Sequence, residues 1–212
     1  MAIFLDSAKK NEVKQAMAYG WVSGVTTNPS LLAKAGRPTE EILEQISSIS
    51  TGPLFYQLMA KTSHEMLREA NKVRDLIGEK LVLKILPTEA GFRFCAQYSG
   101  DFPCCVTAVF GEWQALVARV AGAVYVAIYV NRASRLLGDG IELVRNASAV
   151  LSGSSTQIVA ASIKSPREAS AVFMAGAHHL AIPYDVLQAL MTHELSESAI
   201  AEFYGSGVGI EI

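Results

Sequence analysis

The chain has 212 residues, half of them hydrophobic, and its 18 basic and 20 acidic side chains give a formal net charge of −2. It is long enough to bury a large core in one domain, and the lack of any basic run or stripe argues against a nucleic acid partner. The longest apolar run, residues 120–130, is shorter than the roughly 20 residues that a membrane-spanning helix needs. The first ten residues turn acidic too early for a signal peptide, so we expect a soluble protein.

The three cysteines are Cys95, Cys104 and Cys105. An odd number, with two of them adjacent, argues against a disulfide framework and favours a reducing compartment. We therefore expect small, buried thiols and a cytoplasmic location.

Short apolar or β-branched segments alternate with segments of helical period along the chain. The expected strands are residues 3–6, 22–28, 54–59, 81–86, 104–110, 124–130, 157–162 and 178–183. The expected helices are residues 10–20, 39–49, 63–78, 88–98, 112–122, 141–151 and 166–176, with a C-terminal pair from residue 184 onward. Continuous apolar strands that alternate with helices indicate a parallel sheet with both faces covered.

Eight strand–helix units predict an α/β fold of the (β/α)8 TIM-barrel type, with an additional C-terminal helix. We expect one domain over residues 1–212, in which that helix and a tail occupy about residues 195–212. The main alternative is an open, doubly wound sheet, but no G-x-G-x-x-G follows the first expected strand, which weakens its dinucleotide-binding version.

A polar residue lies near the end of almost every expected strand. These residues are Asp6, Thr26 to Asn28, Gln57, Lys84, Thr107, Tyr129 and Ser162. Because strand side chains alternate between faces, each shares a face with a residue two positions earlier. The pairs are Phe4 with Asp6, Phe55 with Gln57, Val82 with Lys84, Cys105 with Thr107, Ala127 with Tyr129, and Ala160 with Ser162. In a barrel these strand ends meet at one mouth, where active sites lie.

Lys84 stands in an apolar segment, although an ammonium group is costly to bury without a partner. On a structural reading, Lys84 pairs with a carboxylate such as that of Asp6, or extends its nitrogen to solvent. On a catalytic reading, desolvation favours the neutral amine, a nucleophile that forms a Schiff base with a carbonyl substrate. The residue alone leaves both readings open. Asp6, Thr107 and Tyr129 are suitable proton carriers for a Schiff-base cycle.

Several motifs appear together in one order along the chain: "FLDSA", "GVTTNPSLL", a lysine in the fourth strand, "YVAIYVNR", "VAAS" followed by "IKSP", and "AIPYDVL". Because these motifs occur from one end of the chain to the other, essentially the whole chain resembles the small transaldolase and fructose-6-phosphate aldolase family. "GVTTNPSLL" is the most specific of the motifs. The resemblance implies a class I aldol reaction on a TIM barrel that acts on a sugar or sugar phosphate with no cofactor and no metal.

The resemblance also implies roles for residues at matching positions. Lys84 matches the Schiff-base lysine, Asp6 the acid–base carboxylate, and Thr107 the hydroxyl that helps to hold the catalytic water. We take Thr26 and Asn28 as substrate-binding, since Asn28 matches the amide that binds the dihydroxyacetone part.

Arg132 and Ser162 match the phosphate site of the family. An Arg side chain binds a phosphate as a planar fork, which agrees with this role.

Two positions separate the branches that this resemblance covers. Transaldolases carry Glu on strand three and Phe on strand six, whereas this chain has Gln57 and Tyr129, as in fructose-6-phosphate aldolases. We therefore expect cleavage of fructose 6-phosphate, or a related ketose, to dihydroxyacetone and glyceraldehyde 3-phosphate. The alternatives are a transaldolase that passes the three-carbon unit to another aldose phosphate, and a silent sugar-phosphate-binding barrel.

The chain departs from the family pattern at three places. Leu86 stands where the family usually has Pro, and Pro87 follows it. After Arg132 the chain has Ala133 and Ser134 in place of an apolar residue and Asp, which bears on the phosphate preference. Ser7 replaces a more usual Thr.

The C-terminal sequence "YGSGVGIEI" ends with the apolar residues Ile210 and Ile212. By itself it would be frayed, but the family resemblance implies packing on a neighbouring subunit in pentamer-based rings. We therefore expect a homo-oligomer, a pentamer or a decamer. His178 and His179 are adjacent on a strand and point to opposite faces, so we expect packing roles and no shared metal.

Overall fold

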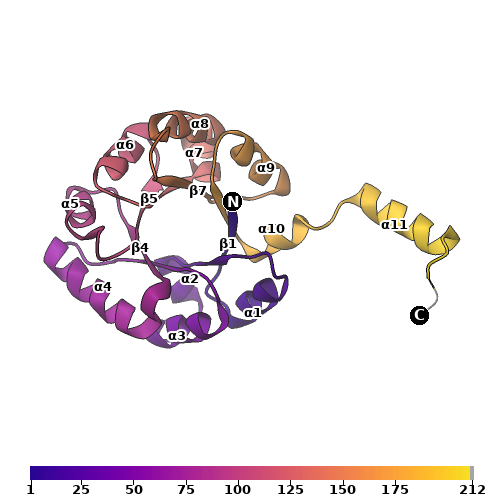
Figure 1. Ribbon diagram of the computed structural model, residues 1–212, viewed down its shortest axis with the longest axis horizontal. Coiled ribbons are helices and arrows are strands. Elements are labelled where there is room, and N and C mark those ends of the chain that lie inside the picture. Colours follow the sequence, from indigo (N-terminus) through magenta and orange to yellow (C-terminus); the bar gives the residue numbers. More distant parts are fainter. Residues whose placement is uncertain (211–212) are drawn as a thin grey trace.

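The computed structural model describes residues 1–210, and its centre is a closed barrel of eight parallel strands (Figure 1). The strands are β1 (Ala2–Asp6), β2 (Gly24–Thr26), β3 (Leu54–Gln57), β4 (Leu81–Ile85), β5 (Cys104–Val109), β6 (Tyr125–Tyr129), β7 (Gln157–Ala161) and β8 (His179–Ile182). Each strand pairs in parallel with the next, and β8 pairs with β1. The predicted (β/α)8 barrel is confirmed, and the open sheet is excluded because β1 and β8 close the ring.

All the helices but the last surround the ring of strands (Figure 1). The helices are α1 (Lys10–Ala18), α2 (Pro29–Lys34), α3 (Thr39–Ile49), α4 (Ser63–Ile77), α5 (Glu89–Tyr98), α6 (Glu112–Val120), α7 (Val130–Leu137), α8 (Gly140–Leu151), α9 (Pro166–Met174), α10 (Tyr184–Ala189) and α11 (Glu194–Ser206). A short 3-10 turn over Gly78–Lys80 leads into β4. Two short helices, α2 and α7, follow β2 and β6 directly and were not expected from the periodicity.

Side-chain caps fix where several helices begin. Asn28, Thr62, Thr88, Asp139 and Ser165 each accept a hydrogen bond from a backbone N–H of the first helical turn. These caps satisfy N–H groups that would otherwise lack a partner at the start of a helix. Because most of them follow a strand closely, they also define the loops that form the mouth of the barrel.

Two separate groups of side chains are buried on the two sides of the strands. Outside the barrel, the strands and helices share a large aliphatic core. Inside, the packed residues are Phe4, Phe55, Val82, Cys105, Ala127, Val159 and Ala181. The expected inward register is therefore confirmed for four of the six predicted pairs, those on strands β1, β3, β4 and β6, and for Cys105 on β5, whereas Thr107 does not line the cavity.

The register expected for β7 is wrong. Val159 faces the interior, and Ala160 belongs to the outer core. Ser162 nevertheless reaches the mouth, because it lies just beyond β7 with φ of 63°. In this left-handed conformation the alternation of strand side chains no longer applies.

Strand β5 is irregular near its end. The register with β6 shifts between Val106 and Val109, and Ala108 has φ of 57°. Such a bulge redirects the side chains around it. The three cysteines are buried and free, as predicted, with Cys104 on the outer face of β5 and Cys105 on the inner face.

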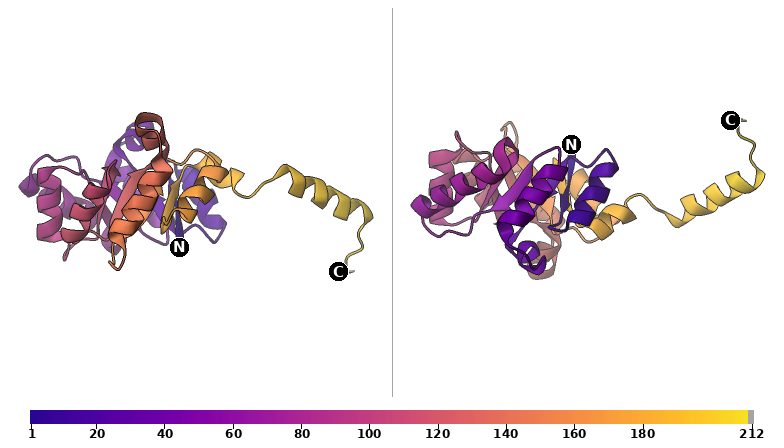
Figure 2. Two further views of the ribbon diagram at one scale, coloured as in Figure 1. Left: turned by 90° about the horizontal axis from the view of Figure 1, so that it is seen from above. Right: turned by 90° about the horizontal axis from the view of Figure 1, so that it is seen from below.

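Helix α11 extends away from the barrel in all the ribbon views (Figures 1 and 2). None of its residues is buried. The assignment of residues 1–212 to one domain therefore stays a prediction, and the end of the expected tail, including Ile212, lies outside the described residues. Within residues 1–210, every helix is too short or too polar to cross a lipid bilayer.

Candidate active site

A cavity of about 340 Å³ opens at the carboxyl ends of the strands. All the predicted site residues except Thr107 line it: Asp6, Thr26, Asn28, Gln57, Lys84, Tyr129, Arg132 and Ser162. Phe55, Cys105 and Ala127 form part of its apolar wall. The polar residues at the strand ends therefore lie around one cavity, as the sequence pattern predicted.

Lys84 lies inside the barrel on β4, between Gln57 of β3 and Cys105 of β5. Only 6% of it is exposed. Its Nζ donates a hydrogen bond to the carbonyl oxygen of Thr27 at 2.9 Å. Among the described residues no carboxylate lies within ion-pair distance of this nitrogen, so the structural reading of Lys84 as a salt-bridged residue is not what the fold shows.

Asp6, at the end of β1, is oriented by the neighbouring strand. The Oγ1 of Thr26 donates to Asp6 Oδ1 at 2.7 Å, and the two residues are register partners across β1 and β2. Thr26 therefore fixes the orientation of the Asp6 carboxylate and leaves Oδ2 available to a group in the cavity.

Asn28 combines a structural and a cavity role. Its Oδ1 caps α2 by accepting the N–H of Leu31 at 3.0 Å, and the side chain also lines the cavity. The cap uses the oxygen, so the side-chain NH2 is the group available to donate to an oxygen of a ligand. An Asn followed by Pro at the first helical position is a sequence signal for a helix start, and it would have identified α2.

Thr107 is fully buried on β5, at the irregular part of the strand, and does not line the cavity. Its Oγ1 has no hydrogen-bond partner among the described residues. A buried hydroxyl without a partner is uncommon and costly, and such groups often serve a catalytic purpose or hold a water.

Tyr129, at the end of β6, is contacted by two side chains. The guanidinium carbon of Arg132 lies 5.1 Å from the centre of the Tyr129 ring, which is a cation–π arrangement. The ring of Phe110 meets Tyr129 edge-on, with centroids 6.0 Å apart. Tyr129 therefore helps to define where Arg132 lies.

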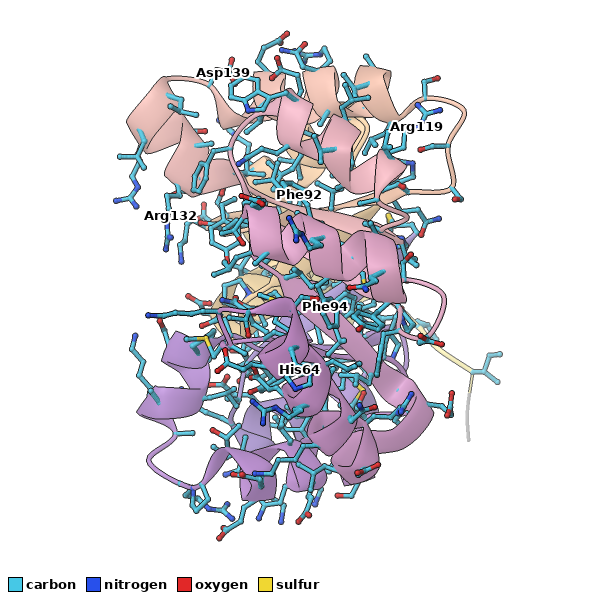
Figure 3. The ribbon with its side chains drawn as sticks, turned by 90° about the vertical axis from the view of Figure 1, so that its left-hand side faces the viewer. His64, Phe92, Phe94, Arg119, Arg132 and Asp139 are labelled. Carbon is cyan, nitrogen blue, oxygen red and sulfur yellow. The ribbon has the colours of Figure 1, made fainter. Side chains whose placement is uncertain are left out.

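Arg132 lies at the mouth end of the barrel on α7, and Figure 3 shows it at the end opposite Arg119. The two residues after Arg132 that depart from the family pattern have structural roles. Ala133 is buried, and Ser134 Oγ accepts the N–H of Gly140 at 3.0 Å, which closes the turn between α7 and α8. A side chain at Gly140 would collide with the carbonyl oxygen of Val130, so this close approach requires glycine. Arg132 therefore lines the cavity despite the departure from the family pattern at Ala133 and Ser134.

Lys164 lines the cavity together with Arg132 and Ser162, and the sequence reasoning missed it. Lys164 belongs to the "IKSP" motif, two residues after Ser162, and this position was the sequence signal that could have identified it as a site residue. Three groups that bind anions well, a guanidinium, an ammonium and a hydroxyl, thus occur at one side of the cavity.

At Leu86, where the chain departs from the family pattern, strand β4 ends differently from the prediction. Strand β4 ends at Ile85, one residue earlier than expected, and Leu86 is 38% exposed beside a second, more apolar cavity that also contacts Met59 and Met66. Lys84 itself stays inside the barrel.

The two adjacent histidines lie at the opposite end of the barrel from the cavity. His178 Nδ1 accepts the N–H of Ile158, and His179 Nδ1 accepts the N–H of Ala2, both at 3.1 Å. Within residues 1–210, no three His, Cys, Asp or Glu side chains gather in a way that could hold a metal ion.

Comparisons with known proteins show which family the chain belongs to. The family model described as Transaldolase/Fructose-6-phosphate aldolase matches residues 3–206. A "Probable transaldolase" of Symbiobacterium thermophilum is 35% identical over 206 residues, which are 96% of this chain and 95% of that one. Another "Probable transaldolase", from Geobacter sulfurreducens, is 34% identical over 96% of both chains.

Among solved structures, a mandelate oxidase variant superposes with a TM-score of 0.62 at 18% identity, covering 90% of this chain and 67% of that one. A second mandelate oxidase structure gives 0.61 at 17% identity, and this chain spans 65% of its length. At such low identity the likeness concerns the barrel fold alone.

Proposed function

Because the chain belongs to the transaldolase/fructose-6-phosphate aldolase family, we propose that it is a class I enzyme in which Lys84 takes a dihydroxyacetone unit from a ketose phosphate. The observation that carries this proposal is the Lys84 amine itself. It is buried, held by a backbone carbonyl rather than a carboxylate, and it faces a cavity that contains Asp6. Within the described part of the chain, no ion pair accounts for its cost of burial, which supports a catalytic role.

In the proposed reaction the Lys84 amine attacks the keto carbon of the substrate and water leaves, which forms an iminium. Asp6 accepts the proton of the hydroxyl on the far carbon of the bond to be broken, two carbons from the iminium carbon, and that carbon becomes an aldehyde. The electron pair of the broken C–C bond flows into the iminium and gives an enamine on Lys84. Thr26 supports this step because its bond to Asp6 Oδ1 orients the carboxylate.

Binding groups are arranged on both sides of the amine. We assign the NH2 of Asn28 to the hydroxyl groups of the three-carbon unit. On the other side, Arg132, Ser162 and Lys164 would bind the phosphate of the departing aldehyde, since all three line the same cavity.

The fate of the enamine separates two reactions. The relatives named above are probable transaldolases, and this supports transfer of the unit to a second aldose phosphate. In that case the enamine is kept from water until the acceptor arrives.

A specific observation favours a second candidate, the aldolase reaction. Gln57 and Tyr129, an amide and a phenol, line the cavity where transaldolases carry Glu and Phe. Together with Thr107 on β5, whose hydroxyl has no hydrogen-bond partner among residues 1–210, they would position a water that protonates the enamine and releases dihydroxyacetone. The buried, free thiols support a reducing compartment, and we place either reaction in the cytoplasm.

Trapping with borohydride tests the shared step. The protein is incubated with fructose 6-phosphate or dihydroxyacetone, reduced, and analysed by intact mass and peptide mapping. We expect one stable adduct, on Lys84, and none in Lys84→Met. Lys80→Met is the matched control, since Lys80 is a partly buried lysine whose Nζ, like that of Lys84, donates to backbone carbonyls, here those of Ser47 and Ser50. An unmodified Lys84 under both substrates would indicate a silent barrel.

Product analysis then separates the two candidates. Release of free dihydroxyacetone from fructose 6-phosphate without an acceptor aldose identifies the aldolase. Turnover that requires the acceptor identifies the transaldolase.

A further inference from the structure

Glu168 lies in the first turn of α9, and both of its carboxylate oxygens accept hydrogen bonds from outside this helix. Oε2 accepts the backbone N–H of Lys164 at 2.7 Å. Oε1 accepts the side-chain Nδ2 of Asn131 at 3.3 Å, across 37 positions of sequence. The residue is half-buried and does not line the cavity.

These two contacts join the two halves of the anion-binding side of the cavity. Asn131 directly precedes Arg132 on α7. Lys164 lies in the loop between β7 and α9, two residues after Ser162. One carboxylate therefore connects the helix that carries the guanidinium to the loop that carries the hydroxyl and the ammonium, and α7 and α9 lie on the same side of the ring (Figure 1).

The loop needs support because its backbone is strained. Ser162 has φ of 63°, a left-handed conformation that is costly for a residue with a side chain. Such a conformation persists only where its surroundings hold it. The carboxylate of Glu168 holds the loop two residues after Ser162, at the N–H of Lys164.

A helix-capping role does not account for these contacts. Ser165 is the N-cap of α9, and its Oγ accepts the N–H of Glu168 at 3.1 Å. In a reciprocal capping box the glutamate would bind back to the cap residue. Here its oxygens bind Lys164, outside the helix, and Asn131, on another helix.

We propose that Glu168 is a positioning residue, which fixes Arg132 relative to the Ser162–Lys164 loop so that the two bind a substrate phosphate together. The inference rests on the proposed function, and it deepens the phosphate part of it. A residue that orients the groups in direct contact with a ligand improves affinity without touching the ligand.

The test compares substrates with and without the phosphate. For Glu168→Ala we expect KM for fructose 6-phosphate to rise about tenfold, the effect of losing roughly one charge-assisted contact. We expect kcat to change little, and borohydride trapping of unphosphorylated dihydroxyacetone on Lys84 to be unaffected. Glu168→Gln keeps one acceptor oxygen, so its effect should be intermediate.

Two variants sharpen the comparison. Asn131→Ala removes one of the two contacts, and its effect should not add to that of Glu168→Ala, because both break the same connection. Glu65→Ala is the matched control. Glu65 also lies in the first turn of a helix, α4, and its carboxylate contacts the cap residue Thr62 on another side of the barrel. It should leave KM for fructose 6-phosphate unchanged.

Binding of inorganic phosphate, measured by calorimetry, gives a readout that does not depend on catalysis. We expect weaker binding in Glu168→Ala and Glu168→Gln than in the parent or Glu65→Ala. Equal losses for phosphorylated and unphosphorylated substrates, or unchanged phosphate affinity in a folded Glu168 variant, would overturn the proposal. Failure to trap Lys84 in the parent would instead overturn the proposed function, and the calorimetric comparison would still decide the role of Glu168.

Discussion

The Nζ of Lys84 lies 2.9 Å from the carbonyl oxygen of Thr27, and the hydrogen bond crosses the barrel interior from β4 to the segment that follows β2. The kind of acceptor matters for the chemistry. A carboxylate partner would stabilise the ammonium form and suppress nucleophilic attack. A backbone carbonyl accepts a hydrogen bond from either an ammonium or a neutral amine, so Thr27 fixes the position of the nitrogen without requiring its charge.

From this arrangement we predict that Lys84→Met abolishes adduct formation and turnover but does not lower stability. Removing a polar group that is buried for function, and filling its space with an apolar chain of similar length, should leave the free energy of unfolding equal or raise it by about 1 kcal/mol. Urea unfolding of the parent and the variant measures the difference. A loss of more than about 2 kcal/mol would mean that Lys84 has a structural role.

The contact between Arg132 and the Tyr129 ring leads to a second prediction. Tyr129→Phe removes the hydroxyl but keeps the ring, on whose face Arg132 lies and whose side Phe110 meets. We expect the ratio of acceptor-dependent transfer to dihydroxyacetone release to increase, with KM for fructose 6-phosphate changed less than threefold. Tyr129→Leu removes the ring as well and should raise that KM, since it also removes the cation–π contact.

Product ratios measured with and without an acceptor aldose check this prediction. An unchanged ratio in Tyr129→Phe would show that the phenol does not decide the fate of the enamine. Equal KM values for the Phe and Leu variants would show that the ring does not position Arg132.

The sequence was sufficient for the barrel and for most of the cavity because both follow from alternation. Apolar strands and helices at regular spacing imply a closed parallel sheet, and period-two patterning places Asp6, Gln57 and Lys84 on the inner face. That logic failed at Ser162, where a left-handed residue ends the alternation and Val159, not Ala160, faces inward.

Contacts between distant segments could not be predicted in this way. Periodicity describes neighbours along one strand or helix, whereas the bond between Glu168 and Asn131 depends on how two helices, α9 and α7, meet in space. Lys164 was missed for a related reason. It lies in a loop after the strand, where no regular pattern indicates the direction of a side chain.

His179 is buried at the end of the barrel opposite the cavity, and its hydrogen bonds require its neutral form. His179 Nδ1 accepts the N–H of Ala2, so it carries no proton, and Nε2–H donates to Gln157 Oε1 at 2.7 Å. Burial, followed by the N-terminal ammonium and His178, lowers the pKa of His179 to about 4. Phe4 and Tyr125, whose rings pack against it, carry no opposite charge.

This arrangement predicts a loss of stability in mild acid. An unfolded His has a pKa near 6.5, so between about pH 6.5 and 4 the unfolded chain binds a proton that the folded chain excludes. Stability should therefore fall as the pH drops from about 6.5, by on the order of 2 kcal/mol by pH 4 to 5, and this contribution should level off below pH 4.

Urea unfolding at pH 7 and pH 5 tests the role of His179. In His179→Asn the side-chain oxygen still accepts the N–H of Ala2 but does not titrate, so the difference between the two pH values should shrink. His64→Asn is the control, since His64 lies exposed on α4, where Figure 3 labels it. An equal difference in the parent and in His179→Asn would assign the acid sensitivity to other groups.

Among residues 1–210, no other element packs extensively on helix α11, and this leads to the last prediction. It has 13 residues, none of them buried, and an isolated helix of that length is marginal in water. Phe203 and Tyr204 are 71% and 88% exposed, and Leu195 and Ile200 add further apolar surface. Exposed apolar side chains grouped on one element are typical of an interface.

We therefore propose that α11 packs on a second copy of the chain, in keeping with the homo-oligomer that the family resemblance implies. Phe203→Glu combined with Tyr204→Lys should lower the mass measured by sedimentation to that of a single 22.7 kDa chain, because both changes place charges in a contact that must exclude water. Glu202→Gln, on the same helix, should leave the assembly intact. If the parent already sediments as a single chain, or the double variant keeps the parental mass, then α11 does not hold copies together.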